Sequence, residues 1–243
     1  MEDKLSIVFE NNDFIVANKP FGITVNRSDT TAAEKTLQDL VEEAGKIDKN
    51  DPDEEFLNRG GIVHRLDKET SGVIIIAKNS MAFRNLQAQF KERRVEKSYI
   101  ALAHGKIQPE KGEINVPVGR LPWNRKRFGV ISGGREALTF YEVVKYLKSG
   151  NDFLTLVRLF PKTGRTHQIR VHLKYINHPI VSDPLYGGRK VSRNDRHDLN
   201  RVFLHAEEIT FYDPKTNEKM NFKAELPSEL ANYLELISKD SNW

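Results

Sequence analysis

The most informative stretch of the sequence reads Gly60-Gly61-Ile62-Val63-His64-Arg65-Leu66-Asp67-Lys68-Glu69-Thr70-Ser71-Gly72, and the apolar run Val73–Ala77 follows it directly. Consecutive apolar residues of this kind are typical of a buried strand. The stretch before the run places charged and hydroxyl side chains between glycines and has few apolar residues. We therefore expect a loop that presents functional side chains at the start of a buried strand.

Asp67 is the candidate reactive group of this loop. An aspartate in such a setting can act as a nucleophile or as a general base. Arg65, two positions earlier, would then be available to contact phosphate. The alternative is structural, because a lone aspartate more often caps a turn or pairs with an arginine. Thr70 and Ser71 fit turn hydroxyls better than nucleophiles.

Residue patterning along the rest of the chain predicts a mixture of strands and helices. Apolar runs or alternation predict strands over 5–10, 14–18, 23–26, 73–77, 99–103, 138–147, 153–160, 202–205 and 208–211. Helical spacing predicts helices over 36–44, 80–92, 167–175 and 230–238, the second capped by Ser80 and burying Met81, Phe83, Leu86 and Phe90. Polar composition indicates exposed loops over 46–58, 123–134 and 189–200. No repeat or long linker divides the chain, so we expect one domain over residues 1–243.

The composition excludes several classes of protein. Hydrophobic residues make up 38% of the 243 residues, which is enough to bury a core and excludes a fully disordered chain. There are no cysteines, so disulfides, iron–sulfur clusters and a cysteine nucleophile are excluded. No apolar run is long enough for a membrane span. The acidic start Met1–Lys4 does not resemble a secretory signal, so we expect a cytoplasmic protein.

Charge is distributed unevenly along the sequence. The formal net charge is +4, but residues 1–60 hold 7 basic and 14 acidic residues, whereas the remainder holds 31 basic and 20 acidic ones. A basic segment of this kind fits a polyanionic partner. Basic stretches around Arg93, around Arg125-Lys126-Arg127-Phe128 and from Arg189 to Arg196 fit contacts to an RNA backbone. Lys126 and Arg127, next to an aromatic ring, are the candidates we name for RNA binding, and a solvated charged surface is the alternative.

The seven histidines do not form a recognisable metal motif. His167 and His172 are five residues apart, and no HExxH pattern occurs. We therefore predict no metal site and interpret the histidines as hydrogen-bonding residues near an anionic ligand.

Several motifs together resemble the RluA-type pseudouridine synthases. His64–Gly72 matches the family signature HRLDxxTSG, and Thr163–Leu173 matches TGRxHQIRxHL without a mismatch. Further similarity lies in Asn18–Val25, Lys97–Ala101 with Gly105, Ala137–Val143, His178–Gly187 and Leu204–Ala206, so that it spans about residues 5–225. The two longest motifs, in this order, are highly specific.

The resemblance implies a fold and a reaction. The fold would be α+β, a single domain built on a mostly antiparallel mixed β-sheet flanked by helices. The reaction would convert uridine in RNA to pseudouridine, by breaking the bond between N1 and C1′, rotating the base and bonding C5 to C1′. It implies an isomerase that needs no cofactor, redox partner or metal. Because a stacked uridine is out of reach, the target has to be flipped out of the RNA.

The resemblance also implies roles for particular residues. Asp67 would be the essential nucleophile or base, a choice that the sequence leaves open. Tyr99 would lie beneath the flipped base, although a strand tyrosine is more often part of a core. Arg170 would pair with Asp67 and keep it ionised, with Arg165 as the alternative. Contacts to RNA or to the flipped base would come from Arg65, His64, Arg165 and Thr70.

Two departures from the family pattern concern local loop geometry. Ser182 stands where the family usually has glycine, and Asn26 stands where it often has histidine. Many relatives also carry an N-terminal S4-type RNA-binding domain, whereas this sequence begins with the pattern of the catalytic domain. We therefore expect a catalytic domain without an S4 domain.

Two other functions compete with this hypothesis. A non-catalytic RNA-binding module would share the fold, but the presence of Asp67 favours catalysis. A glycoside or nucleoside hydrolase also breaks a glycosidic bond, but such enzymes usually use paired carboxylates. The sequence leaves open whether ribosomal RNA of the large subunit or tRNA is the target, and a monomer is the expected oligomeric state.

Overall fold

The computed structural model describes residues 5–27, 34–150 and 152–239. The chain divides into two compact units, which are described separately below. The first unit comprises Met1–Lys97 and Ala206–Glu225, and the second comprises Ser98–His205 and Leu226–Trp243. The acidic N-terminal residues, on which the prediction about a secretory signal depends, lie outside the described residues.

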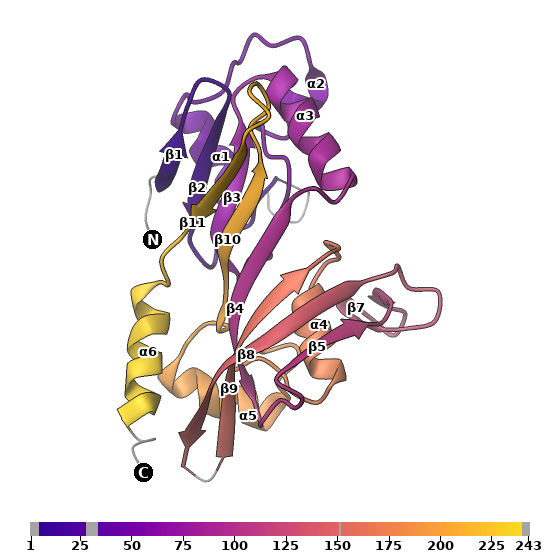
Figure 1. The fold of residues 1–243 in the computed structure, drawn as a ribbon, viewed down its shortest axis with the longest axis vertical. Coiled ribbons are helices and arrows are strands. Elements are labelled where there is room, and N and C mark those ends of the chain that lie inside the picture. Colours follow the sequence, from indigo (N-terminus) through magenta and orange to yellow (C-terminus); the bar gives the residue numbers. More distant parts are fainter. Residues whose placement is uncertain (1–4, 28–33, 151, 240–243) are drawn as a thin grey trace. The chain divides into compact units, whose positions relative to one another are not determined.

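The first unit is built on antiparallel strand pairs. Its sheet has the order β1 (Ile7–Glu10), β2 (Phe14–Lys19), β3 (Ser71–Ala77) and β10 (Leu204–Tyr212, from Ala206 onwards in this unit), and β11 (Lys219–Lys223) pairs with β10 (Figure 1). The strands predicted over 5–10 and 14–18 are confirmed, and β1 and β2 pair in antiparallel register around Asn11–Asp13. All seven residues of β3 are buried, as its apolar run predicts.

Three helices accompany this sheet: α1 (Leu37–Glu43), α2 (Glu54–Asn58) and α3 (Ser80–Lys91). The prediction of an exposed loop over 46–58 is wrong at α2. Asp53 caps this helix by accepting the Phe56 N–H at 3.1 Å, and the Phe56 ring is buried. The predicted helix over 80–92 is confirmed, but Asn79 is its N-cap instead of Ser80, and Met81 is 81% exposed. The predicted strand over 23–26 is absent, because that segment instead accepts hydrogen bonds from the start of α1.

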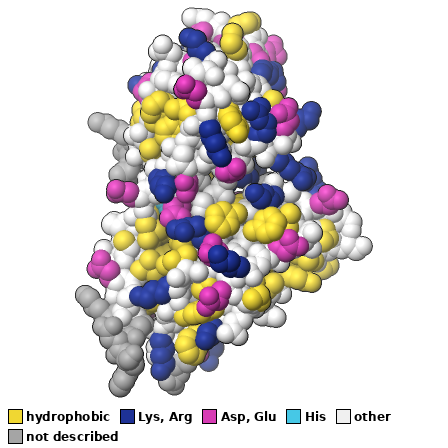
Figure 2. All heavy atoms as spheres, viewed as in Figure 1, with side chains coloured by type: hydrophobic (Ala, Val, Ile, Leu, Met, Phe, Trp, Pro, Cys, Tyr) yellow, Lys and Arg dark blue, Asp and Glu magenta, His cyan; other side chains and the backbone are white. Residues whose placement is uncertain are grey.

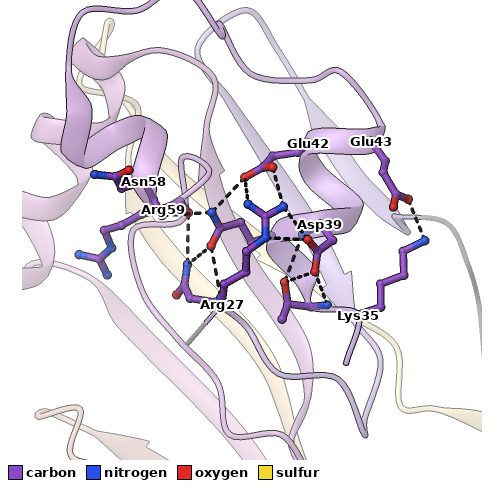
Figure 3. Close-up of polar contacts among 10 residues, drawn as sticks. Arg27, Lys35, Asp39, Glu42, Glu43, Asn58 and Arg59 are labelled. Carbon is purple, nitrogen blue, oxygen red and sulfur yellow. Dashed lines mark hydrogen bonds and ion pairs between the residues drawn. The ribbon is translucent and has the colours of Figure 1, made fainter. Parts of the chain in front are cut away.

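Helix α1 is fixed at its start by charge and capping (Figure 3). Thr36 and Asp39 form a reciprocal capping box. Arg27 binds Asp39 through Nε and Glu42 through both terminal nitrogens, at 2.7 to 3.0 Å. Next to it, Asn26 donates to the carbonyl oxygen of Arg59 at 3.2 Å. The asparagine that departs from the family pattern therefore ties this segment to the end of α2.

The sheet strands of the second unit follow the order β4 (Glu96–His104, from Ser98 onwards in this unit), β9 (Asp152–Pro161), β8 (Leu138–Ser149) and β5 (Lys111–Asn115), and neighbours pair in antiparallel register. The paired strands predicted over 138–147 and 153–160 are confirmed by the register of β8 with β9. A separate hairpin joins β6 (Val118–Leu121) to β7 (Asn124–Val130), so the prediction of a loop over 123–134 is wrong there. The strands predicted separately over 202–205 and 208–211 form the single strand β10.

Three helices belong to the second unit: α4 (Gln168–Tyr175), α5 (Arg189–Asp198) and α6 (Ser228–Lys239). The first and last confirm the predictions over 167–175 and 230–238. The prediction of an exposed loop over 189–200 is wrong, because α5 is helical although it carries mostly charged side chains. Apolar residues of β4, β9, α4 and α6 form one buried cluster with Phe203. The α+β class is therefore confirmed.

Across residues 5–27, 34–150 and 152–239, no helix has both the length and the apolar character that crossing a membrane requires.

Candidate active site

The Asp67 loop, defined as Gly60–Gly72, enters β3 through positions that only glycine fits. Gly61 has φ +70° and Gly72 has φ +122°, and a Cβ at either would collide with a backbone carbonyl, of Ala77 and Ala206 respectively. Leu66 is buried, whereas Arg65 is exposed and Asp67 is half-buried. The loop therefore anchors Leu66 in the core and keeps its neighbours accessible, as the sequence predicts.

A buried lysine holds the backbone just after Asp67. Lys19, at the end of β2, is fully buried, and its Nζ donates to the carbonyl oxygens of Pro20 at 2.7 Å, Ile23 at 2.9 Å and Lys68 at 3.4 Å. The Lys68 carbonyl also accepts the Gly22 N–H at 2.7 Å. The Thr70 N–H closes a turn onto the carbonyl of Asp67 at 3.0 Å. These contacts fix the peptide on which the carboxylate is mounted.

Two other predicted contact residues of this loop are turned toward its own unit. His64 accepts the Ile75 N–H through Nε2 at 2.9 Å and stacks on Phe90. Burial lowers the pKa of His64 to about 3, and the charges of Lys97 and Arg59 act in the same direction, so the ring is neutral at pH 7. Thr70 is 3% exposed, which favours its role in the turn. Contacts of His64 and Thr70 with RNA stay predictions.

In the second unit, Arg170 lies on the first turn of α4 and is 2% exposed. Asp183 binds it in a bidentate ion pair, with Nε to Oδ2 at 2.7 Å and Nη2 to Oδ1 at 2.8 Å. Asp183 is itself fixed by the N–H groups of Leu185 and Tyr186, at 2.9 and 3.1 Å. Asp183 therefore fixes the direction of the guanidinium plane and leaves Nη1 out of the pair.

The segment before Arg170 is organised by a residue to which the sequence analysis assigned no role, Gln168. Its Oε1 accepts from the Thr163 hydroxyl at 2.7 Å and from the Arg165 N–H at 3.0 Å. Its Nε2 donates to the carbonyl of Leu138 at 3.1 Å and to the hydroxyl of Thr139 at 2.9 Å. Gln168 therefore joins the start of α4 to the start of β8, which no local sequence signal indicates.

Arg165, the alternative partner of Asp67, has a different environment. It is half-buried, and its Nε donates to the carbonyl of Glu136 at 2.9 Å. It lines a pocket of ≈ 400 Å³ together with Arg120, Arg135 and Phe128. Arg165 thus faces a basic hollow beside the β6–β7 hairpin, whereas Arg170 is enclosed and held by a carboxylate.

The remaining predicted site residues lie on two strands of the second unit. Tyr99 is half-buried on β4, opposite Leu159 of β9, and packs at the margin of the apolar cluster. Lys126 is exposed and Arg127 half-buried on β7. Tyr186 fixes this strand, because its hydroxyl accepts the Phe128 N–H at 3.1 Å and contacts His167 Nδ1 at 2.8 Å.

Known proteins share both this sequence pattern and this fold. The family model of RNA pseudouridylate synthase matches residues 13–175. The chain belongs to the RNA pseudouridylate synthase family. It is 37% identical to the uncharacterised RNA pseudouridine synthase YlyB of Bacillus subtilis over 97% of this chain and 74% of that protein. It is 36% identical to ribosomal large subunit pseudouridine synthase D of Blochmanniella floridana over 97% of this chain and 73% of that protein.

A solved structure agrees with these relatives. Human RNA Pseudouridylate Synthase Domain Containing 1 is 32% identical and superposes with a TM-score of 0.70, over 93% of this chain and 84% of that one. Membership of the family makes the protein an RNA pseudouridine synthase, an isomerase that acts on RNA. The resemblance found in the sequence motifs is therefore confirmed.

Proposed function

We propose that this pseudouridine synthase modifies a uridine of large-subunit ribosomal RNA and that Asp67 starts the reaction. The observation that carries the proposal is the fixed, half-buried Asp67 on a loop that Lys19 and Gly22 secure through the Lys68 carbonyl. The ribosomal target is suggested by the name of the Blochmanniella floridana relative, which is 36% identical. Transfer RNA is the alternative substrate.

The proposed reaction needs one carboxylate. Asp67 attacks the sugar or removes a sugar proton, the N1–C1′ bond breaks, and the uracil rotates within the site. As C5 then bonds to C1′, Asp67 leaves the sugar or, if it had removed a sugar proton, returns that proton. The proton on C5 departs and N1 regains a proton, so that substrate and product have the same atoms. This balance is the reason why we propose no cofactor.

Tyr99 and Arg170 supply the supporting roles in this proposal. The ring of Tyr99 would support the flipped base, and its hydroxyl would assist the loss of the proton from C5. Arg170 would hold Asp67 ionised through Nη1, the guanidinium nitrogen that Asp183 does not use. We prefer Arg170 to Arg165 because an enclosed, oriented guanidinium fixes a carboxylate better than a half-buried one. Arg65 would fill the space that the base leaves.

The test is pseudouridine mapping with Asp67→Asn as the inactive variant. RNA from cells that lack the protein is treated with wild type or variant, then read by carbodiimide modification and primer extension. We expect a site in large-subunit RNA that only wild type restores, with a rate loss of more than about 10³-fold in the variant. Asparagine keeps the size of the side chain, so RNA affinity should change only a few-fold.

The other outcomes separate the alternatives. A restored site in tRNA would show that tRNA, and not large-subunit ribosomal RNA, is the substrate. Near-normal turnover by Asp67→Asn would refute the assignment of Asp67. RNA binding without any restored site would favour a non-catalytic RNA-binding module. Release of free uracil would favour a hydrolase. A monomeric, cytoplasmic enzyme of one catalytic domain is the organisation we propose with this function.

A further inference from the structure

A pocket of ≈ 490 Å³ lies between β7 and α5 in the second unit. Four arginines line it, Arg127 from β7 and Arg189, Arg193 and Arg196 from α5, together with Ser192, His197 and Pro184. No aspartate or glutamate is among these lining residues. Figure 2 shows basic and acidic side chains interspersed over the face that it draws. The charged side chains of this lining are, in contrast, all basic.

Helix periodicity explains how α5 presents one basic face. Residues at 189, 192, 193, 196 and 197 are spaced by three and four positions and therefore share a face. Asp195 points away from the pocket, because its Oδ2 contacts His104 Nε2 and the Ser182 N–H, both at 2.9 Å. Asp198, next along the helix, is bound to His197 at 2.9 Å. Asp195 is thus committed outside the arginine cluster, and Asp198 is bound to His197 of the lining.

The arginines of the pocket differ in the hydrogen bonds and ion pairs that they form with the protein. Arg196 donates to the carbonyl oxygens of Ser182 and Asn200, at 3.2 and 3.3 Å, which fixes the helix to the segments before and after it. Within the part of the chain that the structure describes, Arg127, Arg189 and Arg193 have neither an ion pair nor a side-chain hydrogen bond. Gathering three such guanidinium groups in one pocket is unfavourable unless an anion joins them.

We infer that this pocket binds a backbone phosphate of the RNA substrate, at a distance along the strand from the target uridine. The inference rests on the proposed function in so far as RNA is the ligand. Guanidinium forks match phosphate oxygens in shape and charge. The lining has no Phe, Tyr or Trp, and its one aromatic ring, that of His197, is bound to Asp198, so the backbone is the part of RNA that fits four guanidinium groups best.

The pocket adjoins the residues that hold Arg170. Pro184, in its lining, directly follows Asp183, which forms the ion pair with Arg170. On the other wall, Phe128 follows Arg127 and is tied by its N–H to Tyr186 of the same loop. A phosphate seated here therefore contacts the loop that orients Arg170, and it would set the position of the strand relative to that residue.

The experiment compares two double variants that each remove two positive charges from the second unit. Arg189→Gln/Arg193→Gln removes two of the four arginine charges that line the pocket. Lys145→Gln/Lys174→Gln is the matched control at exposed lysines outside the pocket. Binding to an unmodified transcript of large-subunit ribosomal RNA is measured by filter retention between about 50 and 200 mM salt. Circular dichroism melting checks that both variants are folded.

We expect the pocket variant to bind about tenfold or more weakly and its salt slope to fall by about one unit for each phosphate that the protein no longer neutralises. The control should stay within about twofold of wild type at equal salt. Under single-turnover conditions, the pocket variant should need a higher RNA concentration to reach half of its maximal rate, because the substitutions weaken substrate binding. Equal losses in both double variants, or no loss in the pocket variant, would overturn the inference.

Failure of this inference can be told apart from failure of the proposed function. If wild type forms pseudouridine but the pocket variant binds normally, only the pocket is misassigned. If wild type forms none while the pocket variant still binds more weakly, the enzyme's substrate is misassigned and the phosphate site stands. Should the double variant not fold, Arg127→Gln on β7 tests the opposite wall by the same measurements.

Discussion

Lys19 in the first unit and Arg170 in the second are both buried cations, and they are held in different ways. Lys19 donates to three backbone carbonyl oxygens, those of Pro20, Ile23 and Lys68. Arg170 meets a carboxylate, Asp183, in a bidentate pair. The compact ammonium ties segments of backbone together, whereas the planar fork fixes a direction. The first arrangement shapes the Asp67 loop and the second aims a guanidinium.

The largest expected effect comes from breaking the charged pair. Asp183→Ala leaves the Arg170 guanidinium buried without its carboxylate, which should lower the free energy of unfolding by about 3–5 kcal/mol. Glu142→Gln, in the exposed pair with Lys111, is the control and should cost less than about 1 kcal/mol. Denaturant unfolding measures both.

A kinetic measurement separates the aiming of Arg170 from stability alone. At a temperature where Asp183→Ala is still folded, the single-turnover rate should fall while the RNA affinity changes little. If the pair served stability only, the folded fraction would keep the wild-type rate. The claim that Asp183 orients Arg170 for the reaction would then be wrong.

Removing the lysine should have a smaller effect. Lys19→Met keeps an unbranched side chain of similar length but removes the donor to three carbonyl oxygens. We therefore expect the free energy of unfolding to fall by about 2 kcal/mol. The Lys68 carbonyl loses the contact from Lys19 and keeps only that from the Gly22 N–H, so the turnover rate should drop as well. Lys19→Arg should not rescue it, because a planar fork does not reproduce the positions of three converging carbonyls. Unchanged activity in Lys19→Met would show that the Gly22 contact alone holds the loop.

The motifs could be located from the sequence, but the partners of these two cations could not. Lys19 and Asp183 both lie inside recognised motifs, yet their roles depend on burial and on contacts with Lys68 and Arg170, which are distant in the chain. The loop around Asp67 was predictable because glycines and polar residues next to a buried strand are a local signal. Gln168 joins α4 to β8 through contacts that no local pattern encodes.

The helices and strands also divide into those that a local sequence signal predicts and those that depend on contacts with distant residues. The helix α1 and the strand β3 were predicted, since apolar spacing and apolar runs are local signals. The capping box of α1 was not predicted. Helix α5 was missed because its residues are mostly charged, and its Asp195 is anchored by His104, far earlier in the chain. Strand β7 was missed because its basic residues lack alternation, and it is defined by its pairing with β6. Tertiary contacts decide these elements.

The smallest expected effect sharpens the comparison at the residue before Asp183. Ser182 is fully buried with φ +62°, the left-handed region that favours glycine, and its hydroxyl has no hydrogen-bond partner among the described residues. Its N–H and carbonyl, in contrast, are bound by Asp195 and Arg196. Ser182→Gly should therefore relieve strain and a buried unpaired hydroxyl, raising stability by about 1 kcal/mol in thermal unfolding. The turnover rate should stay at the wild-type level, because the backbone that positions Asp183 is already fixed by those two contacts. A loss of stability would show that the serine is not strained, and a change in rate would show that the Asp183 pair responds to its neighbour.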